Sequence, residues 1–299
     1  MRLLLPLLAL AAAAWSSTSL AQTTPDTWDK IRNTKSVTIG FRPDSIPFSY
    51  ATEGSAPVGY AIDICKSLLA SLQKELQLPG LQISYRAING QTRFTDLASG
   101  AIDMDCSNTT NTRERRETKQ VSFSMPYYIA GARVLAASSS KIEALADANG
   151  KKVITTKGTT SVAILKEKED LGGMRFVKSE CVNHSECFAA LQKRAVDAWV
   201  MDDIVLASFR AQAEKPGDYK LVGKLLSIEP LSLMMRASDT RLKKFFDGEM
   251  RRMAQSYEIG TLYKKWFESP LPGKGFNLNI PMPYLLSDML RYPSDQFDN

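Results

Sequence analysis

Two kinds of hydrophobic pattern alternate along most of the chain. Short apolar runs bounded by glycine, proline or polar residues are typical of strands, and apolar positions three and four apart are typical of amphipathic helices. Strands are expected at 37–41, 81–85, 101–104, 131–135, 152–156, 176–177, 198–201, 219–222 and 231–235. Helices are expected at 62–76, 94–97, 185–194, 204–213, 240–257 and 260–267. This alternation predicts an α/β fold with mostly parallel sheets.

The two ends of the chain depart from this alternation. Residues 1–21 combine Arg2, an apolar run over 3–14 and a small-residue cleavage site at 19–21. That pattern predicts a signal peptide, and its apolar run is too short to span a bilayer. The mature protein is therefore expected to be exported. The proline-rich end, 271–299, is expected to wrap as an irregular strap.

The distribution of charge limits the classes of partner. The formal net charge is +6, and basic and acidic residues are interspersed along the chain. A nucleic-acid-binding face needs clustered basic residues. The sequence therefore indicates no nucleic-acid partner, and a mildly basic exported protein is compatible with a small anionic ligand.

Four cysteines follow the predicted signal peptide. Export to an oxidising compartment favours a disulfide between Cys181 and Cys187, which are close in the sequence. The alternative is a zinc site that uses both cysteines and His184, but no fourth ligand is evident nearby, so no metal is expected. Cys65 and Cys106 could pair or stay buried as thiols, and the sequence leaves this open.

The segment 105–115 carries the most chemistry. It places amides, small hydroxyls and an arginine where an apolar run gives way to a helix. Asn111 and Glu114 fit a capping box, so the helix is expected to begin at Asn111, with Arg115 one turn in. A helix start and an arginine suit a carboxylate or phosphate. The alternative is a capped surface helix with a solvated basic run.

A similar arrangement of hydroxyls and amides at a helix start follows the apolar run at 152–156. Gly158 allows a tight turn, and Thr159, Thr160 and Ser161 supply hydroxyls and amides at the start of a helical pattern. Two such turns in one chain predict a small ligand held between two α/β units.

Read in order, the motifs resemble those of periplasmic solute-binding proteins, especially the glutamate/aspartate-binding components of ABC importers. The resemblance covers nearly all of the chain after the signal peptide. It rests on the segments 40–50, 58–60, 108–115, 158–161, 198–203, 265–267 and 270–272.

The resemblance implies the type II periplasmic binding fold, with two lobes and a two-segment hinge. Lobe 1 would comprise 36–129 and 229–270, and lobe 2 would comprise 130–228. It further implies that a monomer captures glutamate or aspartate in the cleft and delivers it to an inner-membrane permease. No enzymatic activity and no cofactor are implied.

The resemblance also assigns roles to particular residues. Arg115, with amides at Thr110 and Thr160, would hold the α-carboxylate, and Asp202, with Asn108, would hold the α-ammonium. Arg42, Arg93 and His184 would surround the side-chain carboxylate. Three arginines and one aspartate suit a ligand with two carboxylates and one amine, because each buried charge needs a partner.

These residues also have structural interpretations. Arg42 could cap a strand end, Arg93 could be a solvated helix residue, and His184 could be buried for packing alone. Asp203 could be the amine partner, with Asp202 as the helix cap, but we favour Asp202 as the ligand residue.

Three positions depart from the family pattern. Gly90 stands where relatives have a serine, Phe41 replaces a histidine, and Leu231 replaces a tyrosine. The choice between glutamate, aspartate and another dicarboxylate is therefore open.

Two other functions stay open. The first is an exported cyclohexadienyl-type dehydratase on the same fold, for which His184, Asp202 and Glu180 are candidate general acids. The second is a ligand sensor that acts in trans on a membrane partner.

Overall fold

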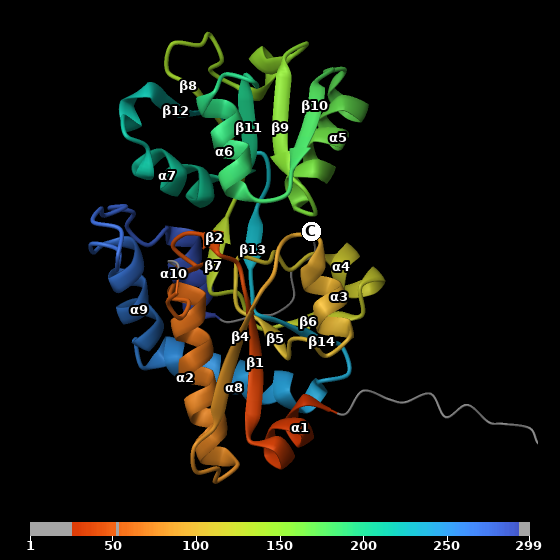
Figure 1. Ribbon diagram of the computed structural model, residues 1–299, viewed down its shortest axis with the longest axis vertical. Coiled ribbons are helices and arrows are strands. Elements are labelled where there is room, and N and C mark those ends of the chain that lie inside the picture. The colour runs from red at the N-terminus through yellow and green to blue at the C-terminus, as the bar shows by residue number, and fades with distance from the viewer. Residues whose placement is uncertain (1–25, 52–53, 293–299) are drawn as a thin grey trace, which may run out of the picture.

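The structure is a computed structural model that describes residues 26–51 and 54–292 (Figure 1). The predicted signal peptide and the last residues of the predicted strap lie outside these ranges. Two lobes are stacked in Figure 1, and each contains a five-stranded sheet with helices. Each sheet separates two clusters of buried apolar side chains, so both of its faces are covered. The predicted two-lobe α/β fold is confirmed.

Lobe 1 contains the sheet β4-β1-β5-β14-β6. Its elements before the hinge are α1 (Thr27–Thr34), β1 (Ser36–Phe41), β2 (Asp44–Ser45), β3 (Ser49–Tyr50), α2 (Tyr60–Glu75), β4 (Gln82–Ala87), α3 (Thr92–Ala98), β5 (Met104–Asp105), α4 (Arg113–Thr118) and β6 (Val121–Phe123). After the hinge the chain returns as β14 (Met234–Arg236), α8 (Thr240–Gln255), α9 (Glu258–Phe267) and α10 (Tyr284–Arg291).

Lobe 2 contains the sheet β10-β9-β11-β8-β12. Its elements are β8 (Ala132–Ala137), the 3₁₀ helix η1 (Leu145–Ala148), β9 (Lys152–Thr156), α5 (Thr160–Gly172), β10 (Val177–Cys181), α6 (His184–Gln192), β11 (Ala198–Asp202), α7 (Asp203–Gln212), the 3₁₀ helix η2 (Pro216–Asp218) and β12 (Tyr219–Val222). The two sheets lie within the bounds expected for the lobes, although those bounds stay a prediction.

Four of the five strands in each sheet run in the same direction. In lobe 1, β1 is parallel to β4 and β5, and β14 is antiparallel to both β5 and β6. In lobe 2, β9 is parallel to β10 and β11, and β8 is antiparallel to both β11 and β12. The prediction of mostly parallel sheets is correct in strand direction. The reversed strands are the first that follow each crossing of the hinge.

Two crossing segments join the lobes. β7 (Tyr128–Ala130) pairs antiparallel with β13 (Glu229–Leu231), so the hinge is a two-stranded ribbon (Figure 1). A methyl group on Gly131 would lie 2.7 Å from the carbonyl oxygen of Ser227, so the two segments are closely packed at the point where they enter lobe 2. The expected single strand at 231–235 is instead two strands, β13 and β14, because the chain turns from the hinge into the lobe 1 sheet.

Helix α2 shows how the hydrophobic pattern positions lobe 1. Ile62, Cys65, Leu69 and Leu72 are buried at helical spacing and pack in the same core cluster as α8 and α9. The helix ends before the sequence Pro79-Gly80, as the sequence predicts.

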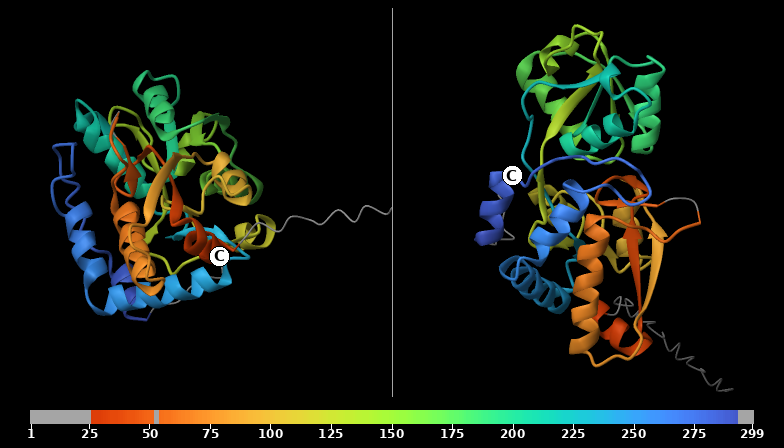
Figure 2. Two further views of the ribbon diagram at one scale, coloured as in Figure 1. Left: turned by 60° about the horizontal axis from the view of Figure 1, so that its bottom comes forward. Right: turned by 90° about the vertical axis from the view of Figure 1, so that its left-hand side faces the viewer.

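The C-terminal segment differs from the expected irregular strap. After α9 the chain is irregular, but it then forms α10, which packs against α8 and buries Leu286 (Figure 2). Apolar positions at helical spacing around Leu286 and Met289 explain this helix, since both side chains meet the lobe 1 core.

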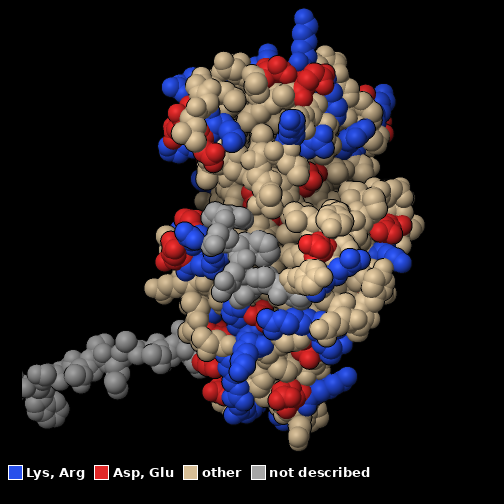
Figure 3. Space-filling view, turned by 180° about the vertical axis from the view of Figure 1, so that it is seen from behind, with Lys and Arg blue, Asp and Glu red and all other residues tan. Residues whose placement is uncertain are grey.

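The surface charge follows the mixed pattern of the sequence. Basic and acidic side chains lie side by side over both lobes on the face seen in Figure 3. Among the described residues, the helices are too short or too polar to cross a membrane.

Candidate ligand-binding site

A small cavity lies between the two lobes. Only about 10 Å³ of it admits the centre of a water molecule, so the lobes are close together. The residues that line it come from both lobes and are Arg42, Arg93, Asn108, Thr110, Arg115, Thr159, Thr160, Met201 and Asp202. All the predicted ligand residues are in this set except His184.

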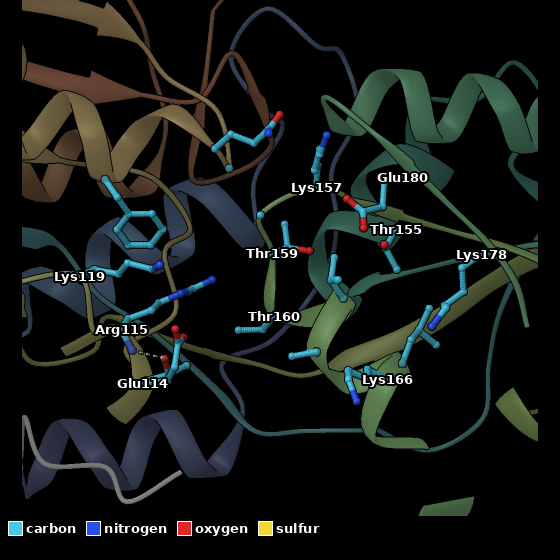
Figure 4. A pocket seen from close by; sticks show the side chains of 18 of the residues that line it. Glu114, Arg115, Lys119, Thr155, Lys157, Thr159, Thr160, Lys166, Lys178 and Glu180 are labelled. Carbon is cyan, nitrogen blue, oxygen red and sulfur yellow. Dashed lines mark hydrogen bonds between the residues drawn. The ribbon is translucent and has the colours of Figure 1, made fainter. Parts of the chain in front are cut away.

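A larger groove leads from the surface to this cavity (Figure 4). Its volume is about 1060 Å³, and it shares Arg115, Thr159 and Thr160 with the cavity lining. In Figure 4, Arg115 and Lys119 of lobe 1 face Thr159 and Thr160 of lobe 2 across this space. The groove therefore connects solvent to the edge of the cavity.

The lobe 1 side of the cavity is organised by a buried carboxylate at the end of β5. Asp105 accepts hydrogen bonds of 2.6 Å from the hydroxyls of both Ser107 and Thr109. Thr109 in turn accepts a hydrogen bond of 2.8 Å from Nη1 of Arg93. Residues 107–111 form the ligand loop. Its backbone also pairs with the chain that leaves the hinge, since Ser232 N donates to the Thr109 carbonyl at 3.0 Å. The ligand loop is thus held by both the sheet and a crossing segment.

Three arginines point into this side of the cavity, and each is at most 5% exposed. Arg115 Nη1 donates to the Thr110 carbonyl at 2.8 Å, and Arg93 Nη2 donates to the Gly158 carbonyl of lobe 2 at 2.8 Å. Among the described residues, Arg42 Nε and Nη2 and Arg93 Nε have no hydrogen-bond partner. Burial and the nearby Arg115 charge hold the pKa of Arg93 well below its usual value. An anion in the cavity would relieve both the repulsion and the unmet donors.

The helix that carries Arg115 begins one residue later than expected. Thr112, not Asn111, is the N-cap of α4, and its hydroxyl accepts from Arg115 N at 3.2 Å. Asn111 instead accepts a hydrogen bond from the Arg116 side chain, and its own backbone N–H donates to Pro230 O at 2.8 Å. The capping-box spacing therefore identified the right turn but the wrong residue, because the hinge strand captures the backbone of Asn111.

On the lobe 2 side, the predicted turn after β9 is present. Gly158 has φ +72°, which explains the glycine, and Thr159 is the N-cap of α5. The Thr159 hydroxyl donates to the Thr156 carbonyl at 2.7 Å, which fixes the turn. The amide of Thr160 therefore lies at the start of a thirteen-residue helix, beside the cavity.

Asp202 and its neighbour Asp203 are distinguished by their hydrogen bonds. Asp203 is the first residue of α7, and its Oδ1 accepts from Ile204 N at 2.8 Å and from Gly131 N at 3.3 Å, so its carboxylate is held at the hinge. Asp202 is the N-cap residue by position, but its side chain makes no capping hydrogen bond. Asp202 lines the cavity, where Oδ2 accepts from Asn108 Nδ2 of lobe 1 at 3.2 Å. Burial, with Glu229 and Asp203 nearby, raises the pKa of Asp202 to about 7. Of the two aspartates, the favoured Asp202 is the one that lines the cavity.

His184 is fully buried and stands outside the cavity lining. Its Nδ1 is 2.8 Å from the Thr156 hydroxyl, while Nε2 has no hydrogen-bond partner among the described residues. Burial, and then the charge of Arg42, lower its pKa to about 3, so the ring is neutral at pH 7. The structure does not place this ring against the cavity, although its neighbours Thr156 and Asp44 connect it to both lobes.

All four cysteines form disulfides. Cys181–Cys187 brackets His184, as predicted, which leaves no thiolates for zinc. Among the described residues, three or more possible metal ligands are nowhere grouped together. Cys65–Cys106, which the sequence left open, ties α2 to the residue before the ligand loop.

Sequence reasoning missed the roles of two residues of the site. Met201 lines the cavity directly, and Asp105 organises the ligand loop. Thr159, which the sequence indicated only as part of the turn, also lines the cavity. Hydroxyls two and four positions after Asp105 were a usable signal, because a buried carboxylate at a strand end needs donors. Met201 was expected only as a buried strand residue.

Comparison with known proteins agrees with this fold. The family model of bacterial extracellular solute-binding proteins, family 3, matches residues 37–269. The chain belongs to this family.

Two curated relatives and one solved structure illustrate the similarity. An L-glutamate/L-aspartate-binding protein of Pseudomonas aeruginosa is 36% identical over 96% of this chain and 95% of its own length. A glutamate/aspartate import solute-binding protein of Salmonella typhimurium is 34% identical over 90% and 89%. The crystal structure of an ancestral amino acid-binding protein, a precursor of cyclohexadienyl dehydratase, is 28% identical with a TM-score of 0.68, over 81% of this chain and 99% of that one.

Proposed function

We propose that this protein captures glutamate or aspartate between its lobes in the periplasm and delivers it to the membrane permease of an ABC importer. The observation that carries the proposal is the charge arrangement of the cavity. Three buried arginines on lobe 1 stand opposite one buried aspartate on lobe 2. A ligand with two carboxylates and one ammonium group matches these charges, and unpaired charges are costly in such a place.

We assign the roles of the residues from their positions. Arg115 and the amides of Thr110 and Thr160 hold the α-carboxylate, because Arg115 and the start of α5 meet where the groove opens into the cavity. Asp202 and Asn108 hold the α-ammonium, since Asp202 Oδ1 and Asn108 Oδ1 are both buried acceptors without a hydrogen-bond partner among the described residues.

The remaining cations are assigned to the side-chain carboxylate of the ligand. Arg42 and Arg93 line the cavity and have buried donors to spare. His184 Nδ1 is 2.8 Å from the Thr156 hydroxyl and the ring is outside the cavity lining, so Arg42 and Arg93 carry this assignment. The names of the two curated relatives, which describe glutamate and aspartate binding, support the same ligand class.

Titration calorimetry tests this proposal on protein that has been unfolded, stripped of ligand and refolded. Glutamate, aspartate, glutamine, asparagine and arginine are compared with succinate, which lacks the amine. We expect one-to-one binding of glutamate or aspartate, much weaker binding of the two amides, and none of arginine or succinate. Binding of neutral or basic amino acids alone would show that the side-chain assignment is wrong.

A dehydratase is the second candidate, because Asp202 is a buried carboxyl whose pKa is raised to about 7 and so could donate a proton. The other candidate acids are less well placed. His184 stands outside the cavity lining, and Glu180 lines the outer groove. Incubation with prephenate or arogenate distinguishes the candidates: we expect no turnover, and turnover that Asp202→Asn abolishes would favour the enzyme. A sensor acting in trans would bind the same ligand but would not support its uptake with the permease.

A further inference from the structure

The two lobes touch through backbone alone at one place beside the cavity. Gly90 precedes α3 in lobe 1, and Gly158 is in the turn between β9 and α5 of lobe 2. A methyl carbon on Gly90 would lie 2.2 Å from the carbonyl oxygen of Lys157, and one on Gly158 would lie 2.3 Å from the carbonyl oxygen of Gly90. Real Cβ atoms essentially never approach closer than 3.0 Å, so neither position can carry a side chain in this arrangement.

The two glycines are needed for different reasons. Gly158 has φ +72°, a left-handed conformation that any L side chain would strain. Gly90 does not have a positive φ, and the nearest atoms to its added carbon all belong to Lys157 and Gly158 of lobe 2. Lobe 1 by itself therefore tolerates a side chain at position 90. Only the approach of lobe 2 excludes one.

This contact sets how far the cavity can close. Arg93 is one turn beyond Gly90, and its Nη2 donates to the carbonyl of Gly158 at 2.8 Å. Both glycines also line the outer groove, at the edge where it meets the cavity. A Cβ at position 90 would require the turn to withdraw by at least the difference between 2.2 and 3.0 Å, which would lengthen the Arg93 hydrogen bond and widen the cavity.

We propose that Gly90 is a specificity-determining residue that acts through lobe closure. Because it has no side chain, the two backbones come into contact, and the ligand is enclosed in a cavity short enough to favour aspartate over the longer glutamate. The ligand class rests on the function proposed above. The closure itself depends only on the contact between the lobes.

The test compares Gly90→Ala with Gly217→Ala, a glycine that also lacks a positive φ but has no atom within 4 Å of an added carbon. Spin labels on cysteines introduced at the exposed positions Ser99 and Glu167 report the distance between α5 and lobe 1. We expect Gly90→Ala to lengthen the shortest interlobe distance and Gly217→Ala to leave it unchanged. An unchanged distance in Gly90→Ala would overturn the proposed closure, whichever ligand the protein binds.

Calorimetry then tests specificity. Gly90→Ala should weaken aspartate binding by about tenfold and glutamate binding by less, because overpacking at a closed contact carries a cost of that size. Urea unfolding of the ligand-free protein should be unchanged, which separates closure from folding. An unaltered aspartate-to-glutamate ratio would overturn the specificity claim. Failure of the proposed function appears differently, as wild-type protein that binds neither acid while the label distances still respond to the variant.

Discussion

The two lobes contribute opposite chemistry to one cavity. Lobe 1 supplies the buried side chains of Arg42, Arg93 and Arg115, whereas lobe 2 supplies Asp202 and the start of α5. Among the described residues, Arg42 and Arg93 each keep at least one donor without a hydrogen-bond partner. Each set of charges is costly without the other. Burial lowers the pKa of Arg115, and the charges of Glu229, Glu114 and, across the cleft, Asp202 oppose this shift. A ligand that pairs with both sets stabilises the closed arrangement more than the open one, which is the thermodynamic basis of closure.

The lobes also differ in how their ligand segments are held. Cys65–Cys106 joins residues 41 positions apart and anchors the ligand loop of lobe 1 to α2, while Cys181–Cys187 spans six positions around His184. Lobe 1 thus holds Arg93 in α3 and Arg115 in α4, where both donate hydrogen bonds to the tethered loop, and lobe 2 presents its groups on a turn and two helix starts. We infer that lobe 1 is the receptor and that lobe 2 is the part whose position changes its affinity.

The largest effect should come from removing the shared cation of lobe 1. Arg115→Met keeps the apolar stem but leaves the α-carboxylate without its main partner, which should cost roughly 3–5 kcal/mol of binding free energy for every amino acid ligand. Calorimetry measures the loss, and the exposed Arg113→Met is the matched control. Retention of glutamate and aspartate affinity within a factor of ten would contradict the assignment.

A comparison of the two disulfides tests the difference in tethering. Replacing Cys65 and Cys106 together by alanine should lower the free energy of unfolding by about 4 kcal/mol, and replacing Cys181 and Cys187 by about 2 kcal/mol, since the longer loop loses more entropy when closed. Urea denaturation gives both values. A larger loss for the pair in lobe 2 would reverse the proposed roles of the two ligand segments.

Neutralising the lobe 2 carboxylate should have a smaller effect. Asp202→Asn preserves the shape and the contact with Asn108 but loses a charged partner for the ammonium, which should cost roughly 1.5–3 kcal/mol of binding free energy. The exposed Asp218→Asn is the control on the same lobe. Wild-type affinity in Asp202→Asn would mean that the amine is held elsewhere, for which Asp203 is the next candidate.

The smallest effect is a dependence on pH. The folded pKa of Asp202 is raised from 3.8 to about 7, so the ligand-free protein loses stability as pH rises from about 4 through 7. The ammonium group of the ligand binds the ionised form of Asp202 more tightly than the protonated form. Affinity should therefore increase from pH 5 to 7, by at most about 1.4 kcal/mol per pH unit, and level off above.

Proton release identifies the group responsible. Calorimetry at pH 6 in buffers of different ionisation enthalpy should detect protons released on binding, and Asp202→Asn should abolish the release. His184 cannot substitute for it, because its lowered pKa of about 3 keeps the ring neutral over this range. Equal proton release in wild type and variant would assign the effect to another group.

The sequence predicted the elements that depend on local pattern. Helix α2, the turn at Gly158 and the anion-binding segment around Arg115 each carry their signal within a few residues. The signal for the Cys181–Cys187 disulfide was also local, because the two cysteines are six positions apart. A resemblance to a known family was needed to bring Arg42, Arg93 and Asp202 together, because they lie far apart in the chain.

What the sequence missed depends on contacts between distant segments. The cap at Thr112 replaces Asn111 because Pro230 of the hinge binds the backbone of Asn111. From the sequence, a glycine at position 90 in place of the relatives' serine means only a missing hydroxyl. The structure shows that this glycine makes a backbone contact with the other lobe. His184 was expected at the ligand from the resemblance to the family, but its ring lies beside Thr156 and outside the cavity lining.

The place of β14 in the sheet has a consequence for how the chain folds as it emerges. β14 fills the gap between β5 and β6, although all of lobe 2 separates it from them in the sequence. A chain that emerges amino end first completes the sheet of lobe 2, which is one continuous segment, before residues 234–236 arrive. Until then β5 and β6 present open edges to any extended peptide nearby. The gap between β5 and β6 must therefore stay free of foreign strands until β14 is available to fill it.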